Sequence, residues 1–268
     1  MKFTISTQEF NYLINKVQNI IPQKATSPIL NNFLIEAAND ELILTATDLT
    51  VSIRCCTDIT ILEEGSTTLP AKRLAQLVRE LSAPNIEFTT NSQEITTIIC
   101  GTSRFKLNGM GTAEYPELPD LSEAQTFQLK QKDLKELLFR TSFAVSKEDT
   151  RYVLTGLLMH VSEGQVSFVG TDGKRLACTH ATLTTPPEFN TQSVIPLKAI
   201  DEVVKCLSEE DGVVDVRIMP DKVGFIANQT LILTKLLSGD YPDVSRVIPE
   251  QSPIAVILHR DEIMRLLR

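Results

Sequence analysis

The chain has 268 residues, 42% of them hydrophobic and 22% charged, with a formal net charge of −8. This length fits two globular domains, each able to bury a core, and the excess of acid taken alone argues against nucleic acid as a partner. No apolar run approaches the roughly 18 residues of a membrane span and no secretory signal opens the chain, so we expect a cytoplasmic protein that does not contact membranes.

The first 110 residues are predicted to form two similar halves, each a strand, a helix and three more strands. Apolar residues at Phe10, Leu13, Ile14 and Val17 share one helical face, and Ser6 starts that helix with a capping box. The predicted helices are Thr7–Ile20 and Ala71–Ser82, and the predicted strands are Lys2–Ile5, Asn32–Ala38, Glu41–Asp48, Val51–Thr57, Ser66–Leu69, Asn85–Thr90, Glu94–Gly101 and Arg104–Met110.

The rest of the chain repeats this order, with helices expected at Gln131–Phe143 and Leu197–Ser208. Thr47-Asp48 recurs as Thr171-Asp172, a shift of 124 residues, and Tyr115-Pro116 recurs as Tyr241-Pro242 after a slip of two. A repeat of this length predicts two tandem domains of one fold. We place them at residues 1–121 and 125–245, and we expect features that only one copy carries to be functional.

The pattern starts a third time near the C-terminus. In the stretch 255–267, Glu262-Ile263 stands where Glu9-Phe10 stood in the first copy. We therefore expect residues 253–268 to begin an incomplete third domain, because one strand and one helix cannot bury a core. The hypothesis that follows is a native protein longer by roughly another hundred residues, one more domain.

The strands are short, rich in Ile, Thr and Val, and joined by tight turns, which predicts antiparallel sheets and an α+β fold with two helices packed on the sheets of each domain. The four complete helices together carry about +3, so the remaining chain carries the acid. Two interpretations stay open: charges scattered over solvated faces, or a basic inner surface with an acidic outer one, which would attract a polyanion to one side.

The sequence contains no P-loop, dinucleotide fingerprint, HExxH or CxxC motif, and its three histidines lack ligand spacing, so we expect no catalytic residue, no metal and no cofactor. Five cysteines without framework spacing are typical of a reducing cytosol. Asp48 and Asp172 occupy equivalent strand ends, which favours a structural role as acceptors for turn amides. A hydrolase that uses Asp172 with Arg175 is the weaker alternative.

The second copy differs from the first in a group of residues that the repeat places at neighbouring strand ends. Arg151, Gly173, Lys174 and Arg175 are gained there together. Glycine allows close approach of backbone to a ligand, arginine offers planar donors, and Leu176, Pro242 and Val247 add apolar surface. Apolar anchors with a few directed polar groups are typical of a peptide groove. The alternative is a surface turn with incidental charge.

Several short motifs, in this order, give the chain a resemblance to a known family. They are MKFTI, Pro28-Ile29-Leu30, Thr47-Asp48-Leu49, Pro70-Ala71, Ser103-Arg104-Phe105, Arg151-Tyr152, Thr171-Asp172-Gly173 with Arg175-Leu176, and Tyr241-Pro242-Asp243. Together they resemble the bacterial sliding clamp, the β subunit of DNA polymerase III, over essentially the whole chain.

The resemblance implies the DNA-clamp fold and a non-catalytic processivity factor for the replicative polymerase. Members have three such domains and form head-to-tail homodimers that encircle duplex DNA, with helices lining the hole. Polymerase, clamp loader and repair proteins bind through linear motifs. The competing hypothesis is a tandem-domain peptide-binding module that does not encircle DNA.

The resemblance also assigns roles to residues. Its partner-peptide pocket corresponds to Arg151, Thr171, Gly173, Lys174, Arg175, Leu176, Pro242 and Val247. Candidate contacts to the DNA backbone are Lys24, Arg73, Lys198 and Arg246, and the dimer interface corresponds to Arg104, Phe105 and Leu107.

Overall fold

The computed structural model describes residues 1–148, 151–183, 189–209, 211–248, 254 and 256–268. The first domain has two helices and nine strands. These are β1 (Lys2–Ser6), α1 (Thr7–Val17), β2 (Asn32–Ala38), β3 (Glu41–Thr47), β4 (Val51–Asp58), β5 (Thr60–Glu63), β6 (Gly65–Pro70), α2 (Ala71–Arg79), β7 (Asn85–Thr90), β8 (Ile95–Cys100) and β9 (Ser103–Asn108).

The second domain repeats the order strand, helix and three strands in both of its halves. Its elements are β10 (Gln125–Lys130), α3 (Gln131–Ser142), β11 (Gly156–Ser162), β12 (Gln165–Thr171), β13 (Leu176–Thr182), β14 (Thr191–Pro196), α4 (Leu197–Cys206), β15 (Val213–Ile218), β16 (Lys222–Ala227) and β17 (Thr230–Lys235). The helix α5 (Arg260–Leu266) begins where the repeat places the first helix of a third copy, and none of its residues is buried.

The sheets are antiparallel, and one of them crosses from one domain into the other. β17 of the second domain pairs with β4 of the first, from Thr230 opposite Cys55 to Thr234 opposite Val51. This pairing creates an eight-stranded sheet in the order β10-β15-β16-β17-β4-β3-β2-β6. The two remaining sheets, β5-β1-β7-β8-β9 and β13-β12-β11-β14, leave β9 and β13 as edge strands at opposite ends of the body.

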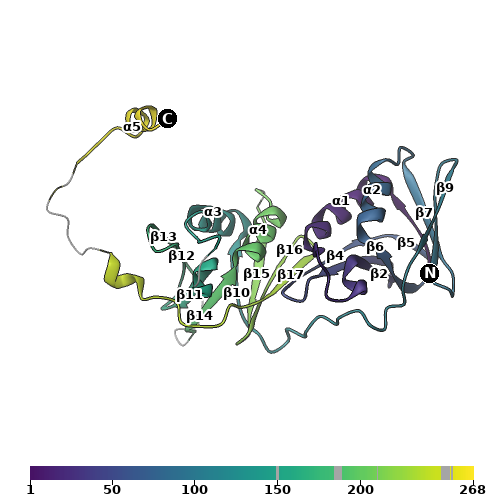
Figure 1. The fold of residues 1–268 in the computed structure, drawn as a ribbon, viewed down its shortest axis with the longest axis horizontal. Helices are drawn as coiled ribbons and strands as arrows, with labels where there is room; N and C mark the ends of the chain where they lie inside the picture. Colours follow the sequence, from purple (N-terminus) through teal and green to yellow (C-terminus); the bar gives the residue numbers. More distant parts are fainter. Residues whose placement is uncertain (149–150, 184–188, 210, 249–253, 255) are drawn as a thin grey trace.

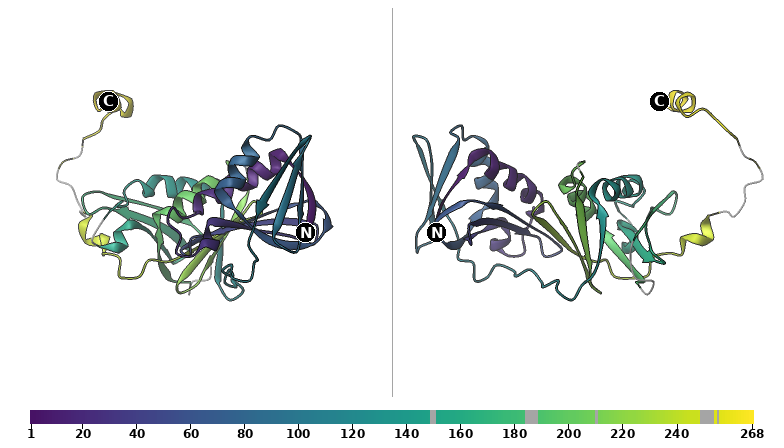
Figure 2. Two further views of the ribbon diagram at one scale, coloured as in Figure 1. Left: turned by 45° about the vertical axis from the view of Figure 1, so that its right-hand side comes forward. Right: turned by 180° about the vertical axis from the view of Figure 1, so that it is seen from behind.

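All four complete helices lie on the same side of the body, with the sheets beneath them (Figure 1). Figure 2 shows the same arrangement after the molecule is turned, and α5 stands apart from the two domains in every view. One apolar cluster runs through both domains and includes Phe10 on α1, Leu74 on α2, Leu134 on α3 and Ile200 on α4. The helices therefore bury one stripe each against the sheets and present the other to solvent.

Helix ends differ slightly from the sequence-based prediction. The first helix ends at Val17 and continues as a 3-10 turn over Gln18–Ile20, because Ile21 precedes a proline and is restricted to an extended conformation. The side chain of Ser6 accepts a hydrogen bond from the Glu9 N–H at 3.1 Å, so the predicted N-cap is present. The sequence-based prediction missed the short strand β5, whose residues are exposed or half-buried.

After each copy, a tyrosine hydrogen-bonds the following segment to a strand of the preceding domain. The Tyr115 hydroxyl donates to the Thr45 carbonyl at 3.0 Å, and the Tyr241 hydroxyl donates to the Val169 carbonyl at 3.2 Å. Because Thr45 and Val169 are related by the repeat, the two segments leave their domains by the same path. Within the described ranges, no helix combines the length and the hydropathy of a bilayer crossing.

Candidate binding pocket and basic surface

The turn between β12 and β13 is built around Asp172. Its Oδ1 accepts hydrogen bonds from the N–H groups of Lys174 at 2.9 Å and Arg175 at 3.0 Å. These two N–H groups hold the pKa of the Asp172 carboxyl below its usual range. Asp48 makes the same bonds to Thr50 and Val51. The predicted structural role of both aspartates is therefore confirmed.

Gly173 occupies a position in this turn whose backbone conformation favours glycine. Its φ is +82°, in the left-handed region, and a Cβ there would come within 2.8 Å of Nη2 of Arg151. The Arg151 guanidinium thus lies directly against the glycine backbone. The sequence placed these two residues at neighbouring strand ends, and the structure brings them into contact.

Around this turn lies a cavity of about 350 Å³. All eight residues that the sequence assigned to the pocket line it: Arg151, Thr171, Gly173, Lys174, Arg175, Leu176, Pro242 and Val247. Leu154, Asp243 and Val244 also line it and were missed. The comparison of the two copies gave no signal at Leu154, because Leu30 stands at the equivalent position of the first copy. Asp243 and Val244 adjoin the predicted Pro242, which was the signal that could have found them.

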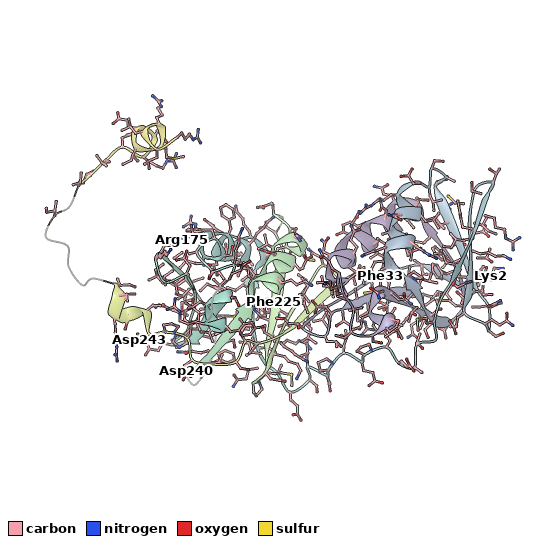
Figure 3. The ribbon with its side chains drawn as sticks, viewed as in Figure 1. Lys2, Phe33, Arg175, Phe225, Asp240 and Asp243 are labelled. Atoms are coloured by element: carbon pink, nitrogen blue, oxygen red, sulfur yellow. The ribbon has the colours of Figure 1, made fainter. Side chains whose placement is uncertain are left out.

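The floor of this cavity is apolar and its rim is charged. Leu176 and Val244 pack on a buried cluster of Leu158, Val169 and Leu237. At the rim, Nε of Arg175 lies 3.1 Å from Oδ2 of Asp172, and its guanidinium carbon lies 5.5 Å from the centre of the Phe143 ring. Figure 3 labels Arg175 and Asp243, which reach the site from separate segments. The arrangement suits an apolar peptide side chain flanked by acceptor groups.

The four residues predicted to contact DNA do not form one cluster. Lys24 and Arg73 are exposed in the first domain. Lys198 pairs with Asp48 across the domain boundary, Nζ to Oδ2 at 2.6 Å, and Arg246 pairs with Asp243 at 3.0 Å. Lys198 and Arg246 thus already hold a carboxylate.

The three residues predicted for a dimer interface all lie on β9. Among the strands that the structure describes, β9 pairs with β8 alone, so its other edge has no strand partner within these residues. Arg104 is exposed, and Phe105 and Leu107 are half-buried. Phe105 lines a cavity of about 490 Å³ that extends to Leu77, Leu81 and Arg73 on and after α2.

The described part of the chain holds no group of three or more His, Cys, Asp or Glu side chains that could bind a metal. Burial raises the pKa of the Cys55 thiol to about 12 and that of Cys206 to about 11, so both stay protonated near neutral pH. Neither thiol is therefore poised as a nucleophile.

Residues 1–119 match the family described as the DNA polymerase III beta subunit, N-terminal domain, and residues 128–243 match the central domain of the same subunit. A beta sliding clamp of Chlamydia muridarum is 46% identical over 268 residues, which is 100% of this chain and 73% of the relative. A beta sliding clamp of Bacillus subtilis is 32% identical over 275 residues and covers the same shares. The crystal structure of a Bacillus subtilis sliding clamp superposes with a TM-score of 0.90 at 33% identity, over 94% of this chain and 68% of that one.

Proposed function

Because this chain belongs to the beta sliding clamp family, the non-catalytic processivity factors of DNA polymerase III, we propose that it works by enclosing duplex DNA and by holding partner proteins through short peptides. Enclosure makes processivity a matter of topology, so the contacts to DNA can stay weak and mobile. We place this activity in the cytoplasm.

The observation that carries the proposal is the common orientation of the helices. α1 and α2 of the first domain and α3 and α4 of the second lie on one side of a sheet that runs through both domains (Figure 1). Domains that all place their helices on the same side of a continuous sheet can be repeated to form a closed ring with the helices inside. Copies with alternating faces could not enclose a duplex.

The pocket around Gly173 supports partner binding. Its apolar floor accepts aliphatic or aromatic peptide side chains, while Arg151, Lys174 and Arg175 at its rim favour acceptor groups and acidic residues. We infer that the polymerase, the clamp loader and repair proteins compete for it, because each would insert a similar short segment.

Lys24 and Arg73 are the candidates for contact with DNA phosphates, since both are exposed cations of the first domain. A phosphate would have to displace a carboxylate from Lys198 or Arg246, so we rank these two lower. Strong base-specific contacts are not needed, because such contacts would slow movement along the duplex.

The free edge of β9 supports a head-to-tail homodimer. β9 is the counterpart, by the repeat, of β17, and β13 is the counterpart of β4. Since β17 and β4 pair with each other at the junction inside this chain, the edge of β9 can pair in the same way with the strand that corresponds to β4 in the third domain of a second subunit. Pairing through such edges joins subunits head to tail, with Arg104, Phe105 and Leu107 at the seam.

Retention on circular DNA tests enclosure. The protein loaded on a nicked circle by its clamp loader is expected to stay bound during gel filtration and to be released once the circle is linearised, because an enclosed duplex can leave only through an end. Equal retention on the two forms would favour the peptide-binding module that does not encircle DNA.

The same assay separates the pocket from the ring. Arg175→Ala and Leu176→Ala are each expected to lower the affinity for a polymerase-derived peptide about tenfold or more. A tenfold change corresponds to the loss of about 1.4 kcal/mol of binding free energy. Retention on circles should stay unchanged once loading is complete. Loss of both properties with a lower melting temperature would mean misfolding.

A further inference from the structure

We propose that Lys198 is a positioning residue which fixes the angle between the two domains through Asp48, and that its ammonium group is committed to this carboxylate rather than to DNA. The family resemblance suggested a contact to the DNA backbone for Lys198. The groups around its side chain indicate instead a role at the boundary between the two domains.

The partner of Lys198 is held rigidly. Oδ1 of Asp48 accepts from the Thr50 and Val51 N–H groups at 2.9 and 2.7 Å, which leaves Oδ2 directed at Lys198 Nζ, 2.6 Å away. An exposed ion pair is usually weak because two flexible side chains must be ordered together. Here only the lysine must be ordered, and the Asp48 side chain is 15% exposed.

The position of Lys198 on its helix gives a second reason. It lies in the first turn of α4, which begins at Leu197. A cation is unfavourable at a helix N-terminus, where the backbone carries partial positive charge, and the described first turn of α4 contains no acidic residue to offset it. The carboxylate of Asp48, from the other domain, supplies the missing negative charge.

Lys198 acts at one end of the seam between β17 and β4. Near it, the Lys235 N–H donates to the Thr50 carbonyl at 2.9 Å. At the opposite end, Lys16 of α1 reaches across the boundary and donates to the Thr230 hydroxyl at 2.9 Å. Two antiparallel strands alone tolerate a range of twist, so side-chain contacts at both ends of the seam restrict the angle between the domains.

The duplicated positions show that this contact belongs to the junction. Asp172 makes the same two turn bonds as Asp48, but its second oxygen binds Arg175 of its own turn. Lys72, the repeat counterpart of Lys198 at the start of α2, is exposed and forms no ion pair within the described residues. Lys72 is therefore a matched control.

Distances between the domains test the proposal. Spin labels on unnatural amino acids at the exposed positions Gln76 of α2 and Asp133 of α3 report the angle by double electron–electron resonance in the whole chain. Lys198→Ala and Asp48→Asn are expected to shift and broaden the distance distribution to the same extent, and the double variant no further. Lys198→Arg should restore the original distribution, and Lys72→Ala should leave it unchanged.

Salt dependence of DNA binding is the second readout. Each lost phosphate contact lowers the slope of log K against log salt by about 0.9. Binding of a short duplex, followed by fluorescence anisotropy, should keep its slope in Lys198→Ala, and Arg73→Ala serves as the comparison for a phosphate contact. If Lys198→Ala lowers the slope of log K against log salt, the proposal is wrong whatever the spin-label distances show. An unchanged distance distribution between the spin labels in Lys198→Ala also contradicts it.

Discussion

The turn at Thr47–Ser52 and the turn at Thr171–Leu176 share one backbone design. In both, the threonine hydroxyl accepts from the N–H two residues on, at 3.0 Å, and the aspartate accepts from the next turn amides. Both turns place their third residue in the left-handed region, Leu49 at φ +73° and Gly173 at φ +82°. The duplication has kept the scaffold of the turn.

What differs is the second wall of each cavity. The first turn faces a cavity of about 620 Å³ that is also lined by residues 116–120 of the segment that follows the first domain and by Lys222, Leu233 and Lys235 of the second domain. The second turn faces a cavity of about 350 Å³ lined by residues of its own domain and of the segment that follows it. In the first copy the turn is part of a domain junction, and in the second it borders a pocket, so one scaffold serves two purposes according to what packs against it.

The largest expected effect concerns the seam beside the first turn. Ile53 is fully buried in β4, opposite Ile232 of β17. Ile53→Ala removes apolar contacts and leaves a cavity, so we expect the free energy of unfolding to fall by about 2–5 kcal/mol, measured by chemical denaturation.

The counterpart of Ile53 in the second copy is Ala177, half-buried on the edge strand β13. Ala177→Gly shortens the side chain at the equivalent position and should lower the free energy of unfolding by about 1 kcal/mol or less. Equal losses at the two positions would contradict the view that only the first turn is part of a structural junction.

An intermediate effect is expected at Gly173. Gly173→Ala places a residue with a Cβ in the left-handed backbone region and brings this Cβ against Nη2 of Arg151. We expect the free energy of unfolding to fall by about 1–3 kcal/mol. Because Arg151 must move, affinity for a polymerase-derived peptide, measured by fluorescence anisotropy, should fall about tenfold or more.

Two glycine changes control that result. Gly111→Ala adds a Cβ with nothing within 4 Å and should change neither stability nor peptide binding. Leu49→Gly, at the counterpart of Gly173, relieves a left-handed conformation and should raise stability by up to about 1 kcal/mol. A destabilised Leu49→Gly variant would instead mean that the packing of this leucine outweighs its backbone strain.

The smallest expected effect is a pH dependence at the second turn. Hydrogen bonds from Lys174 and Arg175 lower the pKa of Asp172 in the folded chain. The ionised carboxylate therefore stabilises the fold above its unfolded pKa, and this contribution is lost as pH falls through the lowered folded pKa. NMR titration should show the Asp172 carboxyl protonating below its usual range and the Lys174 and Arg175 amides shifting with it.

Asp172→Asn should remove that titration while keeping an oxygen for the two amides. If these amide signals still shift over the same pH range in the variant, another group is responsible, and the turn does not owe its order to the charge of Asp172.

The sequence alone determined the repeat, the helices and strands apart from β5, and eight of the residues that line the pocket. Helices and strands follow from the local spacing of apolar residues, as in α1 with Phe10, Leu13 and Val17. The pocket could be predicted because the two copies act as an internal control: Gly173 and Arg175 stand out where Leu49 and Val51 occupy the same turn. The first kind of information lies within short stretches of chain, and the second comes from comparing two copies of the same stretch.

Only the tertiary structure decided how the copies join. No local pattern states that β17 pairs with β4, because either strand could equally have remained an edge. The pairing of Lys198 with Asp48 over 150 residues and the position of Val244 in the pocket also depend on where whole elements come to rest. Hydrogen bonds between distant strands and ion pairs between distant side chains form only when the packing of both domains has fixed their separation.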